Sequence, residues 1–359
     1  MRTVVVSDLH LGTFTRRDLL RHASARAALA ERLQGTDHVV LLGDVLELRE
    51  TPISGVLAQA EPFFRELGDA ARGARVTIVP GNHDHQLAAP VLEALAPDGP
   101  SGLAHSASAP STGPTAVLAE WLEDAPLELA YPGLWIRPDV YAMHGHYLDC
   151  HAAIPALERL AVAVIERVIG GPPPGPRGIA DYEAATEPLY SLLYSLAQAS
   201  RRRRSFLGGG GRSARAWVRL AGRDRRRDLR SRVAASVLVP VVVAALSRAG
   251  VGPLTSDLSG PSLRRSCLRA MADVVAGLRI DAAHVVFGHT HRPGPLPGDD
   301  TWEWELPGGA RLINTGSWLH EPAFLGSSPR ESPYWPGTCV VVEDGEPPRL
   351  EQLLEELPG

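Results

Sequence analysis

The stretch VVVSDLH, residues 4–10, decides how the chain begins to fold. Its three β-branched valines predict a buried strand, and this strand ends directly at polar residues. In extended chain, residues two places apart point to the same side, so Asp8 and His10 can direct a carboxylate and an imidazole at one point. A core strand followed by a polar turn is the plainer interpretation. The choice between the two depends on what the rest of the chain supplies.

The same arrangement recurs along the chain, with a short strand-like run followed at once by polar residues. Further strands are expected at 38–42, 75–79, 140–143 and 284–287. Helical composition at 16–33 and 62–72 predicts βαβ units, and hence an α/β fold with layered helices and strands. The polar groups that follow the strands are Asp8, His10, Asp44, Asn82, His83, His144, His146, His289 and His291. Open α/β sheets gather their ligand-binding groups at such strand ends.

These groups have the chemistry of metal ligands. Carboxylates and imidazoles without thiolates suit Mn, Fe or Zn, whereas sites made only of oxygen ligands suit Mg or Ca. Nine groups are too many for one ion, but two ions about 3.5 to 4 Å apart, bridged by one carboxylate, would use them. We therefore expect two divalent metal ions as cofactors, with Mn as the expected metal and Fe or Zn as alternatives.

The 359 residues, 44% hydrophobic and 21% charged, fit one large α/β domain with an insertion. Residues 165–260 depart from the alternating pattern and predict a helical, Arg-rich insertion or lid. The core would then comprise residues 1–164 and 261–359. Strands expected at 311–314 and 338–342 suggest that the C-terminal third forms a second small sheet.

The predicted insertion carries an unusual charge and an apolar run. Thirteen Arg residues lie between positions 201 and 232 against two Asp residues, a local charge of +11, while the whole chain has a charge of -5. Such a block suits phosphates, nucleic acid or anionic lipid headgroups, and a solvated helix is the alternative. Residues 233–246 are almost wholly apolar, but they contain Pro240 and are too short to span a bilayer. They suit a buried helix, or peripheral membrane contact through 201–246.

Three widely spaced cysteines, without a CxxC pair, imply neither a disulfide framework nor a thiolate zinc site. The N-terminus enters a strand directly, which leaves no room for an apolar signal segment. We therefore expect a cytoplasmic protein, with possible contact at the inner membrane face through the basic and apolar stretches.

Five blocks in the chain, taken together and in order, resemble the signature of the calcineurin-like metallophosphoesterase superfamily. The blocks are Asp8-x-His10, Gly43-Asp44, Gly81-Asn82-His83-Asp84, His144-Gly145-His146 and Gly288-His289-Thr290-His291. Each is weak alone, whereas all five, each after an expected strand, make a strong match. The resemblance covers about residues 1–150 and 280–320. It implies a two-sheet αββα sandwich, interrupted here by the helical insertion, and a dinuclear metallophosphoesterase.

The resemblance also implies roles for individual residues. The ligands of the first metal ion would be Asp8, His10 and His291. The ligands of the second would be Asn82, His144 and His289, with Asp44 bridging the two ions. A hydroxide that bridges the metals would be the nucleophile. His83 resembles the residue of the family that contacts the phosphate and protonates the leaving oxygen, and His146 and Arg292 are expected near the substrate.

Within the superfamily, SDLHLG at 7–12, GDVLE at 43–47 and GHTHRP at 288–293 look closest to the UDP-diacylglucosamine pyrophosphohydrolase group. That group cuts a nucleotide-sugar-lipid diphosphate and has a helical insertion over its site. This chain has His83 where the group is expected to have Arg, and His146 where it is expected to have Asp. Because a His can protonate an alkoxide leaving group, His83 favours a phosphodiester substrate.

The sequence thus predicts a metal-dependent phosphohydrolase that acts on a phosphodiester, with an anionic and partly apolar substrate. A nucleotide-sugar-lipid pyrophosphohydrolase, a nuclease and a non-catalytic metal-binding scaffold remain alternatives. A nucleic-acid partner is disfavoured because the basic run carries only Phe206 and Trp217 as stacking residues. The scaffold is disfavoured because every expected ligand is present.

Overall fold

The computed structural model describes residues 1–94, 102–151, 178–199, 260–325 and 328–358. The predicted basic block at 201–232 and the apolar run at 233–246 lie outside the described residues. The chain divides into two compact units. The first comprises Met1–His146, Tyr190–Arg204 and Ile280–Gly359, and the second comprises Tyr147–Leu189 and Ser205–Arg279. Every expected metal ligand belongs to the first unit.

The first unit contains a mixed seven-stranded sheet in the order β11-β10-β1-β2-β3-β5-β4. Its parallel centre consists of β1 (Arg2–Val6), β2 (His38–Leu42), β3 (Arg75–Val79) and β5 (Leu127–Tyr131). Strands that pair antiparallel with their neighbours complete the edges, namely β4 (His105–Ser108), β10 (Thr338–Glu343) and β11 (Arg349–Gln352). The parallel centre brings the carboxyl ends of β1, β2 and β3 to one edge of the sheet.

A second, four-stranded sheet has the order β6-β7-β8-β9. It consists of β6 (Gly133–Arg137), β7 (Val140–Met143), β8 (His284–Phe287) and β9 (Arg311–Asn314). Strands β7, β8 and β9 are parallel, and β6 is antiparallel to β7. The expectation that the C-terminal third forms this sheet alone is wrong. Two of its strands come from before the insertion, and β10 instead pairs with β1, where Val340 lies opposite Val5.

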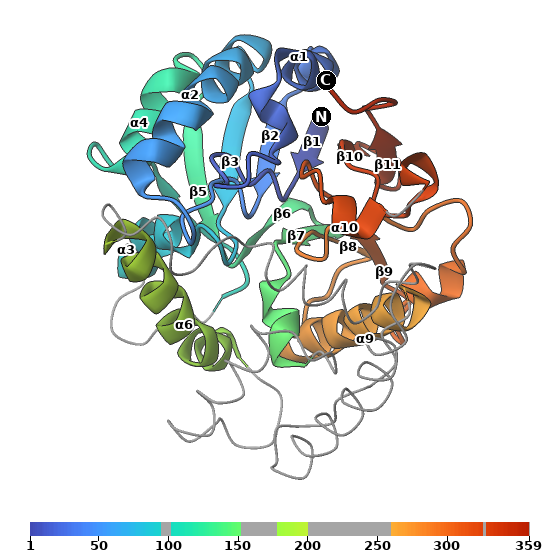
Figure 1. Cartoon of the computed structure of the whole chain (residues 1–359). Coiled ribbons are helices and arrows are strands. Elements are labelled where there is room, and N and C mark those ends of the chain that lie inside the picture. The colour runs from blue at the N-terminus through green and yellow to red at the C-terminus, as the bar shows by residue number, and fades with distance from the viewer. Residues whose placement is uncertain (95–101, 152–177, 200–259, 326–327, 359) are drawn as a thin grey trace, which may run out of the picture. The chain divides into compact units, whose positions relative to one another are not determined.

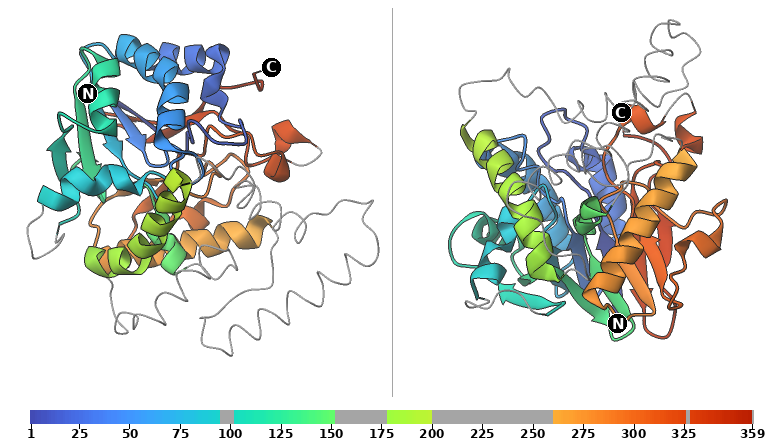
Figure 2. Two further views of the ribbon diagram at one scale, coloured as in Figure 1. Left: turned by 60° about the vertical axis from the view of Figure 1, so that its left-hand side comes forward. Right: turned by 90° about the horizontal axis from the view of Figure 1, so that it is seen from below.

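Alternate side chains of the central strands enter two different cores. Val4 and Val6 of β1 pack in a core cluster with residues of α1 (Ala23–Leu33), α2 (Ile53–Ala70) and α4 (Pro114–Leu122), which cover one face of the large sheet (Figures 1 and 2). Val5 packs instead with residues of the second sheet, such as Val286. Burial on both faces explains the unbroken valine run. The protein therefore has an α/β fold with two mixed sheets and flanking helices.

Helix α2 begins at Ile53, well before the expected start at Pro62, which lies inside the helix. Proline removes one backbone hydrogen bond there, but the buried face of the helix, including Phe63 and Phe64, outweighs this loss. The other helices in the described part of the chain are α3 (Ala89–Ala94), α6 (Ile179–Ala199), α9 (Gly260–Leu278) and α10 (Pro322–Leu325). Short 3-10 turns are η1 (Leu19–Arg21), η2 (His85–Ala88), η3 (His146–Cys150), η5 (Thr301–Trp304) and η6 (Pro329–Glu331). Within the described residues, none of the helices has both the length and the apolar character needed to cross a bilayer.

Candidate metal centre

The loops that follow the parallel strands of both sheets bring the expected ligands together. Among the residues that the structure describes, three groups of His and Asp side chains have ligand atoms within 4.8 Å of one another. These groups are Asp8, His10 and His291; His10, Asp44 and His83; and Asp44, His144 and His289. Because they share His10 and Asp44, the three groups form one continuous centre rather than three separate sites. Two clusters can be distinguished within it, and His10 and Asp44 connect them.

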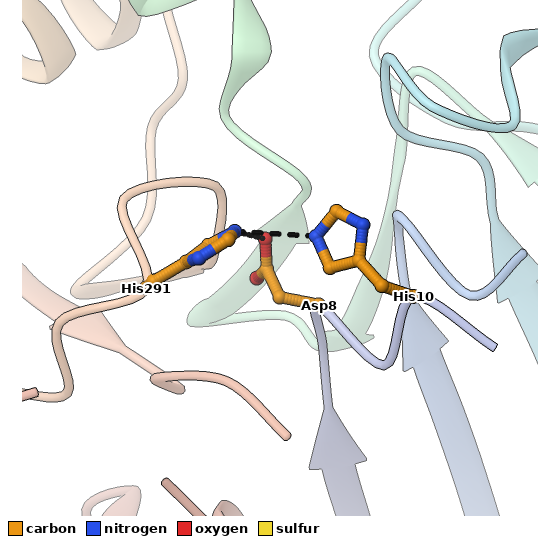
Figure 3. A group of neighbouring side chains, drawn as sticks. All are labelled: Asp8, His10 and His291. Atoms are coloured by element: carbon orange, nitrogen blue, oxygen red, sulfur yellow. Dashed lines mark hydrogen bonds and ion pairs between the residues drawn. The ribbon is translucent and has the colours of Figure 1, made fainter. Parts of the chain in front are cut away.

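The first cluster joins the end of β1 to the loop after β8 (Figure 3). His291 Nε2 lies 3.2 Å from Asp8 Oδ1 and 3.2 Å from His10 Nε2. His10 uses its other nitrogen, Nδ1, to donate a hydrogen bond to Glu47 Oε2 at 3.0 Å. In the neutral ring, Nε2 therefore presents a lone pair to the cluster, as in a metal-ligating histidine.

The second cluster consists of Asp44, His144 and His289. Its central residue, His144, follows β7. His144 Nδ1 donates to the Leu42 carbonyl at 2.9 Å, so in the neutral ring the Nε2 lone pair faces the cluster. That nitrogen lies 3.3 Å from Asp44 Oδ2, and the same oxygen lies 3.8 Å from His10 Nε2. One carboxylate oxygen of Asp44 thus lies between the two clusters, where a bridging ligand is needed.

The side-chain amide of Asn82 indicates whether the second cluster suits a cation. Its side-chain oxygen lies 3.2 Å from His144 Nε2 and 3.1 Å from His289 Nδ1, so three atoms with lone pairs face one another. Without a cation the opposite amide orientation is favoured, in which the NH2 group donates to the histidines and the oxygen accepts from Arg49. A cation reverses this preference, because amide oxygen is the ligand atom. The donor set therefore fits a metal ion.

The electrostatics of the cluster also favour positive charge. Burial disfavours protonation of His10, but the hydrogen bond to Glu47 and the nearby Asp44 raise the pKa of His10 to about 9. Burial likewise opposes protonation of His144, whereas Asp44 raises the pKa of His144 to about 10. The negative field that attracts these protons is the field that attracts a divalent cation.

Five of the ligand candidates adopt backbone conformations that are rare for residues other than glycine. Their φ angles are positive: Asp8 53°, His10 47°, Asp44 50°, His289 66° and His291 59°. Left-handed conformations are enriched for Asp and His but still carry a cost, and they tend to occur at functional sites. Each side chain is thus aimed by a strained turn just beyond a strand.

Asp84 is a structural carboxylate that the sequence did not distinguish as such. Its two oxygens accept backbone N–H bonds from Asp44 at 3.2 Å, Val45 at 2.7 Å, Leu46 at 3.1 Å and Gly81 at 2.7 Å. Burial and the neighbouring Asp44 raise the pKa of Asp84 to about 6. These bonds tie the loops after β2 and β3 together and so fix the position of Asp44.

Residues 1–168 match the model of a family described as calcineurin-like phosphoesterase. This part of the chain, a little less than half of its 359 residues, is similar to that family. With the cluster of His and Asp side chains, the match identifies the protein as a hydrolase that acts on phosphoester bonds. The matched residues include Asp8, Asp44, Asn82 and His144, whereas the block that contains His289 lies beyond them. A solved structure described as a dimetal phosphatase from Danio rerio is 12% identical, with a TM-score of 0.33 and 95% of each chain covered. No curated protein matches the chain in sequence.

Glu47 links two parts of the phosphoesterase site and was not among the predicted site residues. Its carboxylate accepts from His10 Nδ1 at 3.0 Å and from His83 Nδ1 at 2.7 Å, and it is only 2% exposed. Burial opposes its ionisation, but the two histidines hold the pKa of Glu47 well below its usual range. Its position three residues after Asp44 was a signal in the sequence, but its partners are visible only in the fold.

We expect Glu47→Gln to weaken divalent-metal binding or activity about 10- to 100-fold, the usual effect of removing the partner of a metal-ligating histidine. The amide keeps the size of the side chain but loses the charge that orients both rings. Calorimetric titration with Mn²⁺ and steady-state rates would measure the two effects. Glu305→Gln would be the surface control, and wild-type values for both measurements in Glu47→Gln would contradict the expectation.

His83 lies on the more accessible side of the cluster. Its side chain is 23% exposed, whereas Glu47 is buried. Burial lowers the pKa of His83, Glu47 and Asp44 oppose this, and Arg49 adds to it. Since Nδ1 is held by Glu47, Nε2 is the nitrogen that can exchange a proton with a bound substrate.

The two residues expected near the substrate, His146 and Arg292, are both buried. His146 is 1% exposed, and its Nε2 lies 3.3 Å from Tyr131 Oη within a buried aromatic group. Arg292 is 7% exposed and donates to Asp299 through both terminal nitrogens, at 2.9 and 2.6 Å. Both side chains therefore have structural partners within the protein, and neither is on the accessible side with His83.

Proposed function

We propose that the protein hydrolyses phosphodiesters with the help of two divalent cations, which we take to be Mn²⁺. The observation that carries this proposal is the position of Asp44 Oδ2, between a group containing His10 and a group containing His144. Asp8, His10 and His291 would hold one cation, Asn82, His144 and His289 the other, and Asp44 both. Two cations held there would supply an activated water nucleophile and neutralise charge on the phosphate oxygens.

The residues of the chain would perform the proton transfer. His83 would stand beside the scissile bond and donate a proton from Nε2 to the departing alkoxide oxygen. Glu47 would hold the ring through Nδ1 and stabilise its protonated form. An alkoxide needs this proton more than a phosphate leaving group does, and this difference supports a diester over a diphosphate.

Three further features stay predictions from the sequence. They are the anionic, partly apolar substrate, the peripheral membrane contact through 201–246 in a cytoplasmic protein, and the role of residues 165–260 as a lid. Most of these residues lie outside the described part of the chain.

The test is hydrolysis of bis(p-nitrophenyl) phosphate compared with p-nitrophenyl phosphate, after removal of metal with EDTA and after addition of Mn²⁺. We expect turnover that requires the added metal and a kcat/KM for the diester at least about 10-fold above that for the monoester, a difference of about 1.4 kcal/mol in transition-state stabilisation. Faster monoester turnover would overturn the diester assignment. Turnover that persists without metal would overturn the proposed metal dependence.

A further inference from the structure

Ser7 and Thr315 are buried hydroxyl residues beside the candidate metal centre, and neither has a role in the mechanism above. Ser7 directly precedes Asp8, and Thr315 directly follows β9. We propose that Ser7 and Thr315 are positioning residues, whose hydroxyl groups form a chain that holds one oxygen of Asp8 and leaves the other for a cation. This proposal rests on the proposed function, because it takes Asp8 to be a ligand of the first cation.

The two carboxylate oxygens of Asp8 have different surroundings. Oδ2 accepts the Ser7 hydroxyl and also the backbone N–H of His289, the latter at 2.9 Å. Oδ1 lies 3.2 Å from His291 Nε2, and it accepts no hydrogen bond from the residues that the structure describes. Figure 3 shows one oxygen of Asp8 directed toward His291. Because Asp8 is fully buried, an oxygen without a donor is costly unless a cation pairs with it. Asp8 therefore offers one oxygen, Oδ1, to the first cluster.

The direction of the hydroxyl chain follows from a count of its protons. Ser7 Oγ contacts Asp8 Oδ2, Thr315 Oγ1 and, at 3.2 Å, the Gly316 carbonyl. A hydroxyl group has one proton to donate, and the charged carboxylate is the strongest of these acceptors, so Ser7 donates to Asp8. In the contact between the two hydroxyl groups, Thr315 is then the donor and Ser7 the acceptor. A hydroxyl that accepts one bond while it donates another is polarised, which strengthens the bond to Asp8.

The surrounding backbone fixes both hydroxyl groups. The N–H of Thr315 donates to the Phe287 carbonyl at the end of β8, at 2.9 Å. Gly288 packs so closely that a Cβ there would meet the Ser7 hydroxyl and would lie 2.8 Å from Ser7 Cβ. Ser7 and Thr315 are almost completely buried, so bulk water does not supply a substitute donor when a hydroxyl is removed. Loss of either hydroxyl therefore weakens the hold on Asp8 Oδ2.

The hydroxyl chain acts on only one of the two clusters. Asp8 forms a ligand group with His10 and His291, and it is not part of the group formed by Asp44, His144 and His289. Removal of a hydroxyl should therefore weaken the binding of one cation and spare the other. This selectivity distinguishes a positioning role from general support of the fold.

The test is calorimetric titration of the metal-free, full-length protein with Mn²⁺, in which two binding steps are expected. Ser7→Ala and Thr315→Val should weaken one step about 10- to 100-fold, as removal of a ligand's partner usually does, and leave the other within about twofold. Thr315→Ser keeps the hydroxyl and should bind both ions as the wild type does. Thr3→Val is the matched control: Thr3 is fully buried in β1, and its hydroxyl has no hydrogen-bond partner among the described residues.

Wild-type Mn²⁺ binding in Ser7→Ala or Thr315→Val would overturn the proposal. Equal weakening of both steps, or a loss in Thr315→Ser as large as in Thr315→Val, would also overturn it, because the hydroxyl groups would then only support the fold. If one of the two variants does not fold, the other decides by the same criteria.

The proposed function fails separately from this proposal. Wild-type protein that binds two Mn²⁺ ions but hydrolyses no diester refutes the activity, while the titrations still decide the role of Ser7 and Thr315. Wild-type protein that binds no Mn²⁺ overturns both.

Discussion

Asp44→Asn is expected to remove activity and at least one of the two proposed metal ions. The amide has the shape of the carboxylate but not the charge with which Asp44 Oδ2 would join the two clusters, 3.3 Å from His144 Nε2 and 3.8 Å from His10 Nε2. Because metal stabilisation of phosphoryl transfer is worth several kcal/mol, we expect kcat/KM to fall by on the order of a thousandfold or more. Metal content after dialysis against Mn²⁺, measured by mass spectrometry, gives the second readout.

Asp69→Asn is a suitable control for this variant, since Asp69 is an exposed residue that pairs with Arg72. It should keep both the metal and the activity. An Asp44→Asn protein that retains two metal ions per chain, or that loses less than about tenfold in kcat/KM, would show that Asp44 does not bridge the ions.

Gly81→Ala is expected to damage the centre as strongly, through a single methyl group. The new Cβ would meet Asp44 Oδ1 and would lie 2.6 Å from His144 Cδ2 and 2.7 Å from the Asp44 nitrogen. Asp44 and His144 cannot move apart freely, because backbone and side-chain bonds fix both of them. We expect the free energy of unfolding to fall by about 1–3 kcal/mol, the usual cost of overpacking, and Mn²⁺ binding to weaken severely.

Chemical denaturation and Mn²⁺ calorimetry measure the two effects of Gly81→Ala. The matched control is Gly308→Ala, where a Cβ would have no heavy atom within 4 Å. That variant should leave both quantities unchanged. Wild-type stability and Mn²⁺ affinity in Gly81→Ala would mean that the loops after β2 and β3 are looser than their hydrogen bonds indicate.

The sequence predicted the strand ends of the site well because a strand followed by polar residues is a local pattern. Asp8 and Asn82 follow β1 and β3 as expected. Pairing between distant segments could not be predicted in this way, so β10 was assigned to the wrong sheet. The roles of Glu47 and Asp84 were missed for the same reason, since each depends on partners from another loop.

The helix boundary at Pro62 shows a different limit. Proline is a good local signal for the first turn of a helix, so the sequence favoured a start there. In α2 the burial of Val56 and Phe64 on one face extends the helix on both sides of the proline. Burial of this kind depends on the sheet against which the helix packs, and a local pattern does not contain it.

The left-handed backbone conformation at five candidate ligands lowers the stability of the fold while it positions the side chains needed for activity. Glycine adopts a positive φ without strain, so glycine in place of Asp8 or His289 would relax the backbone while removing a candidate ligand. In an evolving or engineered population, selection for thermal stability alone would therefore favour loss of the centre. Only selection for turnover retains these residues, and a thermostable version of the protein has to gain its stability elsewhere in the fold.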